Sequence, residues 1–337
     1  MNIQQDNLTI LRMFAAVMVL YGHSFEFLGM THPLFAQSTT FGPLGVNIFF
    51  SISGYLVIQS WESDPNLYRF WVRRILRIFP ALTVCILLTI FLIGPINTKY
   101  SYWDYFKNEY TWGYLSNIYL YITFYLPGVF AENRVPNNVN GSLWSLPVEF
   151  SMYLILPILS FFGKMKNNLI AILILSILLS IFWAFQTTTM LVFYRTDMRQ
   201  IAMCGVYFFM GACFHTFKIK KYFNLSYVLI IFVIWLSLSR WSVAFALSSW
   251  FCIPFIALAF GVSNENILSK YVKNDYSYGI YIYAFPIQQT IASIYPNINF
   301  YNYLIISILS TLLLAYASWH LIEKQFLKFK PKKFVSI

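Results

Sequence analysis

Long apolar runs recur along the whole chain, and they leave few folds open to it. Of the 337 residues, 59% are hydrophobic and only 10% are charged, which is far from the composition of a soluble domain. Many of the runs approach the roughly 20 residues that a helix needs to cross the hydrocarbon core of a bilayer. Lipid cannot satisfy backbone N–H and C=O groups, so such runs fold as helices. We therefore predict an all-α fold, a polytopic bundle of transmembrane helices.

About ten spans are expected, in a single membrane domain that covers residues 1–337. Their approximate bounds are 9–29, 44–61, 75–95, 143–162, 169–187, 200–217, 223–239, 242–261, 276–294 and 303–323. The N-terminal residues lack the basic region of a signal peptide, so we expect the first span to be retained.

The distribution of positive charge predicts the orientation. An even number of spans puts both termini on one side of the membrane. Sixteen of the 23 Lys and Arg residues, Lys270 and Lys273 among them, fall on that side, six fall on the other, and Arg12 lies inside the first span. The positive-inside rule then places both termini in the cytoplasm. Residues 324–337 form a basic cytoplasmic tail that suits an anionic leaflet surface.

One connecting segment is unusually long. Residues 96–142 are expected on the extracytoplasmic side and are dense in Tyr, Trp and Phe. The stretch 113–130 is apolar, but it is short and aromatic. That character favours an interfacial or re-entrant helix over a span.

The first span carries ionisable residues, which is costly in a membrane and usually marks a functional path. Arg12, His23 and Glu26 lie in LTILRMFAAVMVLYGHSFEFLG. Arg12 and His23 are eleven positions apart, so in a helix they share one face and are separated along the axis by about 16 Å. The predicted orientation puts Arg12 near the cytoplasmic end and His23 near the outer end.

The predicted orientation also gives a depth in the membrane to a glutamate and to a group of arginines. Glu149 falls in the outer half of the fourth predicted span, near the depth of His23, and an unpaired carboxylate there is costly. Arg69, Arg73 and Arg77 precede or open the third span from the cytoplasm, and Arg73 and Arg77 share a helix face. Plainer interpretations exist: the arginines are also typical of a topological stop, and His23 of a hydrogen-bonded interior histidine.

No metal site is indicated by the spacing of possible ligands. The four cysteines lie within apolar runs without a CxxC pair, and the remaining histidines form no HxxxH or HxH pair. We interpret the cysteines as small buried hydrophobic residues.

Six motifs, taken in order, resemble the acyltransferase-3 family of integral membrane acyltransferases. They are Arg12 and His23 with ten residues between them, GVNIFFSISGYL (45–56), RRILRIFPA (73–81), SLWSLPVEFSMYLILP (142–157), DYSYGIYIYAFPI (275–287) and WHLIEKQF (319–326). The resemblance covers nearly the whole chain and matches the family's ten-helix size. One departure is Ala284, where many members carry histidine, so a role inferred for that histidine cannot be assigned here.

The resemblance implies transfer of an acyl group, most often acetyl from acetyl-CoA, to a carbohydrate hydroxyl. A lipid-linked glycan of the O-antigen or capsule type is the expected acceptor, and the bacterial inner membrane the expected location. Arginine binds phosphate well, so Arg69, Arg73 and Arg77 would meet the CoA phosphates. Arg12 would contact the donor or neutralise a carboxylate.

The same reading gives the catalytic residues. His23, held by a carboxylate such as Glu149 or Glu26, would deprotonate the acceptor hydroxyl. An acetyl-imidazole intermediate on His23 is an alternative route that the sequence does not separate from direct transfer.

The main rival is a proton-coupled secondary transporter or flippase of a glycan or small solute, with His23, Glu149 and Arg12 as a relay. The chain has no inverted repeat and no matching pair of Gly/Pro-broken helices, and the arginine cluster has no task in that scheme. Binding of acetyl-CoA by the purified protein would separate the two hypotheses.

Overall fold

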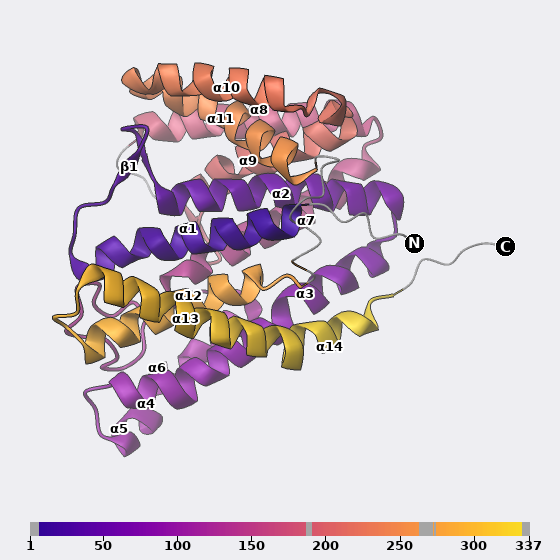
Figure 1. Ribbon diagram of the computed structural model, residues 1–337. Coiled ribbons are helices and arrows are strands. Elements are labelled where there is room, and N and C mark those ends of the chain that lie inside the picture. The colour runs from indigo at the N-terminus through magenta and orange to yellow at the C-terminus, as the bar shows by residue number, and fades with distance from the viewer. Residues whose placement is uncertain (1–6, 187–190, 263–271, 273, 332–337) are drawn as a thin grey trace. The chain divides into compact units, whose positions relative to one another are not determined.

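The computed structural model describes residues 7–186, 191–262, 272 and 274–331, and helices dominate them (Figure 1). Four features of the sequence interpretation fall wholly or partly outside the described residues: Lys270, Lys273, the last residue of the fifth predicted span, and the tail from residue 332 onward.

Every predicted span coincides with a helix, which confirms the helical class of the fold. These helices are α1 Leu8–Leu28, α2 Phe41–Ser63, α3 Leu67–Leu88, α7 Ser145–Phe161, α8 Met165–Phe185, α9 Met198–Thr216, α10 Leu225–Ser237, α11 Ser242–Gly261, α12 Ser277–Ile294 and α13 Phe300–Ser318. Two antiparallel hairpins are the sheets of the described chain. They pair β1 Leu34–Phe35 with β2 Thr39–Thr40, and β3 Val192–Phe193 with β4 Thr196–Asp197.

Seven helices of the described ranges are long and apolar enough to cross a membrane, as expected of an integral, multi-pass membrane protein. The helices α9, α10 and α12 are not among the seven. Helix α12 is less apolar because it carries polar residues such as Gln288 and Gln289. Both are among the 12 buried residues of its 18, and a helix enclosed by protein can carry polar side chains. The number of spans and the location of the termini stay predictions.

The chain forms two compact units. The first comprises residues 1–15, 33–67 and 148–275, and the second comprises residues 16–32, 68–147 and 276–337. In the first unit α2 packs closely on α9, because Gly54 and Gly211 bring the two backbones together. A Cβ at Gly54 would lie 1.8 Å from the Phe208 carbonyl oxygen, and one at Gly211 would lie 2.1 Å from that of Ser51.

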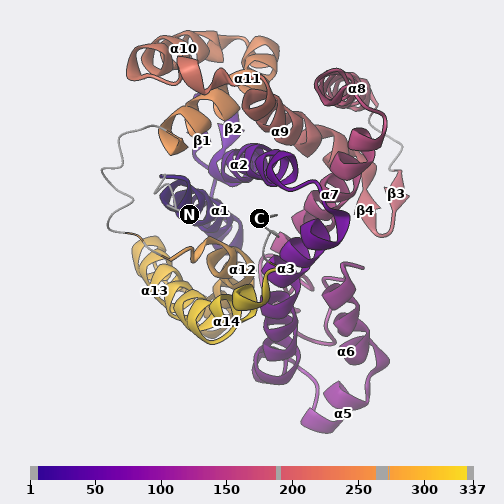
Figure 2. The same ribbon diagram turned by 90° about the vertical axis from the view of Figure 1, so that its right-hand side faces the viewer.

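In the second unit α12 and α13 lie side by side (Figures 1 and 2). A buried cluster of Phe27, Phe285, Ile291 and Tyr303 joins the end of α1 to both helices. The hydroxyl of Tyr303 donates to the Gln288 carbonyl at 3.0 Å, which ties α13 to α12. The second unit therefore places the C-terminal part of α1 against the α12–α13 pair.

The long connecting segment also belongs to the second unit. It contains α5 Tyr102–Lys107, α6 Glu109–Gly113 and a 3-10 turn Tyr114–Tyr119, which follow α4 Gly94–Asn97 (Figure 2). Helix therefore ends at Tyr119, where Leu120 adopts a left-handed conformation with φ 65°, earlier than the stretch 113–130 indicated. Burial raises the pKa of Tyr105, whose hydroxyl donates to the Ile90 carbonyl. Any entry of this segment into the membrane stays a prediction.

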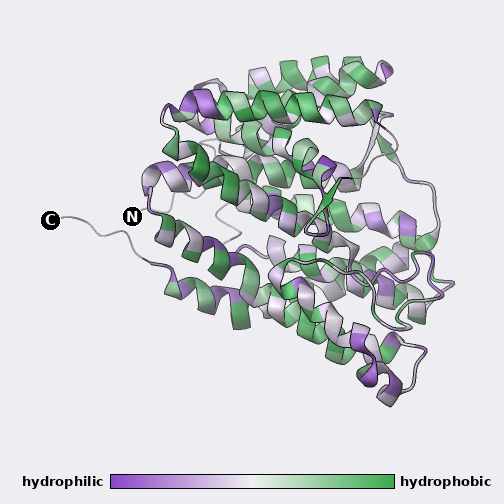
Figure 3. Cartoon of the chain, turned by 180° about the vertical axis from the view of Figure 1, so that it is seen from behind, coloured by the Kyte–Doolittle hydropathy of each residue, from purple (hydrophilic) through white to green (hydrophobic). Residues whose placement is uncertain are grey.

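The hydropathy of the residues varies regularly between the helices and their connections. Apolar residues extend along most of their lengths, and hydrophilic residues concentrate near helix ends and in connections (Figure 3). On α8 only 17% of the apolar window is buried, and Ile174, Leu178 and Phe182 are exposed. Such a surface is unfavourable in water and favourable in lipid, so α8 has the character of a lipid-facing helix.

Candidate active site

A histidine and a glutamate meet on the C-terminal part of α1. The Nδ1 atom of His23 lies 3.3 Å from Oε2 of Glu26, one helical turn further along. The side chain of His23 is 22% exposed and that of Glu26 is 44% exposed. Because the carboxylate occupies the Nδ1 side, the tautomer that donates from Nδ1 leaves Nε2 as a proton acceptor. This arrangement of a base and the group that orients it suits general-base chemistry.

A second histidine joins this pair from the segment after α1. The Nε2 atom of His32 lies 3.8 Å from Oε1 of Glu26, the oxygen that His23 does not use. The sequence interpretation did not include His32, because it lies beyond the helix and has no regular spacing to His23. Its position next to Glu26 comes from the turn of the chain after α1.

Aromatic rings enclose His23 within the second unit. The ring centroid of Phe285 lies 5.1 Å from that of His23, in an edge-on arrangement, and that of Phe27 lies 6.1 Å away. Phe285 is next to Ala284, the position where the sequence departs from the family pattern. The imidazole therefore has apolar walls on the sides of α12 and α1.

Hydrogen bonds fix α12 against α1 behind these rings. The amide nitrogen of Gln288 donates to the Leu20 carbonyl and to Ser24 Oγ, each at 2.9 Å. All three residues are almost completely buried. A buried amide that lost these partners would be costly, so the bonds hold the two helices in one register.

A proline in α12 gives the helix another fixed contact. Pro286 has no N–H, so the carbonyl four residues earlier, that of Ile282, lacks its helical partner. That carbonyl accepts from Asn140 Nδ2 at 2.8 Å and from Cys85 Sγ at 3.4 Å. The segment before α7, α3 and α12 thus meet at the carbonyl that the proline frees.

Glu149 lies in the first unit, on α7. Its Oε1 atom accepts hydrogen bonds from Ser53 Oγ on α2 and from the Tyr153 hydroxyl one turn along α7, both at 2.5 Å. Two hydroxyl donors satisfy part of the carboxylate's need for hydrogen bonds in an apolar setting. The sequence predicted the importance of Glu149, but it did not indicate Ser53 or Tyr153 as its partners.

Arg12, also in the first unit, forms an ion pair with Asp275. The distance from Arg12 Nη1 to Asp275 Oδ2 is 2.8 Å, and the two side chains are 23% and 13% exposed. Of the two roles expected for Arg12, this contact corresponds to neutralising a carboxylate. The sequence interpretation quoted Asp275 within a motif but assigned it no partner.

Arg69, Arg73 and Arg77 lie on the first half of α3, in the second unit, and all three are half-buried. Arg74 turns to another side and places its guanidinium 5.5 Å from the centre of the Phe70 ring. The arginine cluster of α3, defined here as Arg69, Arg73 and Arg77, concentrates positive charge on one helix, as an anionic ligand requires.

The structure thus pairs His23 with Glu26 and gives Glu149 its own partners in the other unit. Within the described ranges, no three or more His, Cys, Asp or Glu side chains gather in a way that could hold a metal ion. These features define a multi-pass membrane protein with a histidine–carboxylate pair suited to acid–base chemistry.

Comparison with known proteins identifies the family. The model of the acyltransferase domain family matches residues 5–320, so the chain belongs to that family and is an acyltransferase, as its motifs predicted. No solved structure matches the chain.

Similar proteins agree with this assignment. The O-acetyl transferase of Shigella phage Sf6 is 32% identical over 322 residues, which cover 94% of each chain. The O-acetyltransferase OatA of Staphylococcus aureus is 27% identical over 376 residues, which cover 96% of this chain and 58% of that protein. Nodulation protein 10 of Rhizobium leguminosarum bv. viciae is 34% identical over 162 residues, 46% of this chain and 44% of that protein.

Proposed function

We propose that this protein transfers an acetyl group from cytoplasmic acetyl-CoA to a hydroxyl of a cell-surface glycan, in the inner membrane of a bacterium. The names of its relatives support the transfer of an O-acetyl group, and one of them, the peptidoglycan O-acetyltransferase OatA of Listeria monocytogenes, supports an acceptor of the polysaccharide class. The observation that carries the proposal is the 3.3 Å contact between His23 and Glu26 inside an otherwise apolar helix.

In this proposal His23 is the general base. Its Nε2 atom takes the proton of the acceptor hydroxyl as the oxygen attacks the thioester carbonyl, and Glu26 stabilises the imidazolium that results. The C–S bond then breaks, and the proton passes from His23 to the departing thiolate, so that CoA leaves as the free thiol. A positioned base of this kind contributes about 10²–10⁴-fold to a rate.

The arginine cluster of α3 is proposed to hold the phosphates of the donor. Its guanidinium groups can bind phosphate oxygens in pairs, and half-burial strengthens such contacts relative to open water. Arg12 is placed differently in the proposal: because it binds Asp275, we assign it the neutralisation of that carboxylate rather than a donor contact.

Glu149 is proposed to contact a polar group of the substrate. Its oxygen Oε1 accepts hydrogen bonds from Ser53 and Tyr153, whereas Oε2 accepts none from the residues that the structure describes. That oxygen is therefore available to a polar group of the substrate. This supports a role in orientation or charge balance.

The test is a transfer assay on purified protein with acetyl-CoA and a glycan acceptor. Acetyl mass on the glycan, with release of free CoA thiol, is the expected result. Protein that does not bind acetyl-CoA, and that moves a glycan across vesicles without acetylating it, would instead support the transporter hypothesis.

A further inference from the structure

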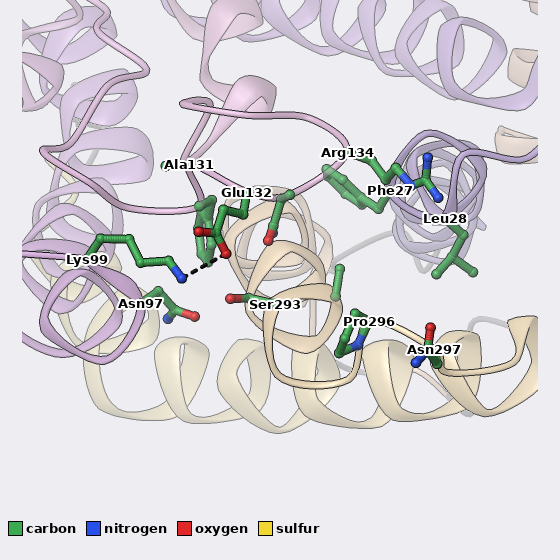
Figure 4. A pocket seen from close by; sticks show the side chains of 13 residues that line it. Phe27, Leu28, Asn97, Lys99, Ala131, Glu132, Arg134, Ser293, Pro296 and Asn297 are labelled. Atoms are coloured by element: carbon green, nitrogen blue, oxygen red, sulfur yellow. Dashed lines mark hydrogen bonds and ion pairs between the residues drawn. The ribbon is translucent and has the colours of Figure 1, made fainter.

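A pocket of about 360 Å³ opens beside the end of α1, entirely within the second unit (Figure 4). Its wall comes from four parts of the unit: the end of α1, the end of α4 with Lys99 two residues beyond it, the loop 130–134, and the segment 292–297. The volume lies near the lower end of the range for small-ligand pockets, about 300–1,000 Å³. Such a pocket suits a small group rather than a long polymer.

The pocket carries one uncompensated positive charge. Lys99 and Glu132 neutralise each other at one end, with Nζ and Oε2 2.8 Å apart (Figure 4). Arg134 lies at the other end, near Phe27 (Figure 4), and makes no hydrogen bond or ion pair with any residue of the described chain. Its guanidinium carbon would lie 3.6 Å from a Cβ at Gly29, just past the end of α1. An anionic group is the natural partner for this free cation.

Other polar groups of the pocket also have unused capacity. Ser293 and Asn297 make no side-chain hydrogen bond within the described residues, and both are exposed. Asn97 donates from Nδ2 to the Ile93 carbonyl, which leaves its Oδ1 for another partner. By contrast, the amide nitrogen of Asn133 already donates a hydrogen bond to Oε1 of Gln289. A ligand with several hydroxyl groups would satisfy the unused set.

Phe27 connects the pocket to the candidate active site. Its ring lines the pocket, and its centroid lies 6.1 Å from that of His23. Phe27 is itself buried in the cluster with Phe285, so it closes the base of the pocket, and the polar side chains around it are the groups that can meet the hydroxyls of a sugar. A sugar held here lies one side chain away from the proposed base.

We propose that this pocket is an acceptor subsite that binds an anionic sugar residue, with its carboxylate or phosphate on Arg134. The inference rests on the proposed function and deepens it, because it names the chemical class of the acceptor. Carboxylate and phosphate both pair with a guanidinium by two parallel hydrogen bonds. Lys99 and Glu132 cancel each other in the net charge, and the sugar hydroxyls meet the polar side chains of Ser293 and Asn297.

The experiment measures binding to the full-length protein in detergent by saturation-transfer NMR. The probes are glucuronic acid, glucose 1-phosphate and neutral glucose. We expect both acids to bind at least about 10-fold more tightly than glucose, the ratio that a charge-assisted hydrogen bond gives. Whichever acid binds more tightly identifies carboxylate or phosphate as the preferred group.

Three variants test the residues. Arg134→Gln is expected to reduce the affinity for both acids to that for glucose, while Arg240→Gln, an exposed arginine of the first unit, leaves it unchanged. Glu132→Gln frees Lys99 and is expected to raise the affinity for both acids. A gain of this kind cannot come from misfolding, so it keeps the test decisive if Arg134→Gln is unstable.

Unchanged affinity in both Arg134→Gln and Glu132→Gln would overturn the subsite, and a loss of thermal stability without loss of binding would show that Arg134 only caps α1. Neither result touches the proposed function, which His23→Ala tests separately. That variant is expected to bind the acids normally and to transfer nothing. Normal transfer by His23→Ala would reject the proposed base and leave the binding result standing.

Discussion

At the residue scale, the proposed chemistry depends on the orientation of one imidazole, that of His23. Glu26 meets Nδ1 of His23 at 3.3 Å, and Phe285 and Phe27 limit how the ring can turn. A ring held in this way presents the same nitrogen, Nε2, to every incoming hydroxyl. Rotational freedom that is lost in advance does not have to be lost at the transition state.

Glu26→Gln should therefore reduce turnover by about 10- to 10³-fold, less than removal of the base itself, because the amide can still contact the ring but cannot stabilise its charge. The acetyl-CoA affinity should stay the same. His32→Gln is the matched comparison, since His32 meets the other oxygen at 3.8 Å and should matter less. Steady-state kinetics with both substrates varied would measure this. A larger loss from His32→Gln would mean that the assignment of the orienting group is wrong.

Glu149→Gln keeps the shape of the side chain and removes its charge. We expect a strong fall in turnover with little change in donor affinity, because Glu149 is proposed to act on the reacting groups. Ser53→Ala, which removes one of its two hydroxyl donors, should have a weaker effect in the same direction. Titration of each variant with acetyl-CoA supplies the control. If donor binding fell as much as turnover did, Glu149 would belong to the donor site instead.

Local spacing predicted part of this site. His23 and Glu26 are three positions apart on one helix, so their contact follows from helix geometry alone. Asp275 and Ser53 are different: their contacts with Arg12 and Glu149 join positions 263 and 96 residues apart. Only tertiary packing brings such residues together, and a single sequence carries no signal for it.

At the scale of the elements, the close approach of α2 and α9 is a structural requirement of the first unit. Gly54→Ala should destabilise the protein by about 1–3 kcal/mol, the usual effect of overpacking, because its Cβ would lie 1.8 Å from a backbone oxygen. Gly42→Ala on the same helix is the control. Its Cβ meets nothing within 4 Å, so it should be neutral or slightly stabilising. Thermal unfolding in detergent measures both, and equal stability of the two variants would contradict the packing account.

The arginines of α3 give a second prediction at this scale. Arg73→Ala or Arg77→Ala should weaken acetyl-CoA binding by about 10- to 150-fold, since a charge-assisted hydrogen bond contributes about 1.5–3 kcal/mol. Saturating donor should then restore much of the rate. Arg74→Ala, on another side of the helix, should matter less.

Acetyl-pantetheine provides the control for the arginines, because it lacks the nucleotide and its phosphates. The variants should handle it almost as well as the unchanged protein does. A stop-transfer role predicts a different pattern, with altered abundance in the membrane and normal affinity in the protein that remains. That pattern would show that the arginine cluster only fixes the orientation of α3 in the membrane and does not bind the donor.

The elements themselves were largely predictable, because the length of an apolar run reports a helix directly. The segment 96–142 was not, since its aromatic residues serve two purposes. Tyr105 and Tyr114 are fully buried, while Trp103 and Tyr110 are exposed. Composition cannot separate a buried ring from one at the surface, so the order of its short helices could be learned only from the structure.

At the scale of the whole molecule, donor and acceptor are proposed to reach the site from opposite sides of the membrane. The distribution of charge predicts that the arginine cluster, on the first half of α3, lies at the cytoplasm, and that His23, on the C-terminal part of α1, lies toward the other side. The donor would thus enter from one side and the acceptor from the other. Proteoliposomes in which all protein has one orientation would accept acetyl-CoA from the cytoplasmic face alone.

The most direct measurement is acetyl transfer in such proteoliposomes, with labelled acetyl-CoA and a glycan acceptor, by the unchanged protein and by His23→Ala. Removal of a polar group from a span should not impair insertion, and donor affinity in the variant should be normal. The account predicts that label reaches the glycan in the unchanged protein and that transfer by His23→Ala falls by about 10²–10⁴-fold. If His23→Ala, correctly inserted and binding donor, keeps more than about a tenth of the rate, then His23 is not the base and the central claim is wrong.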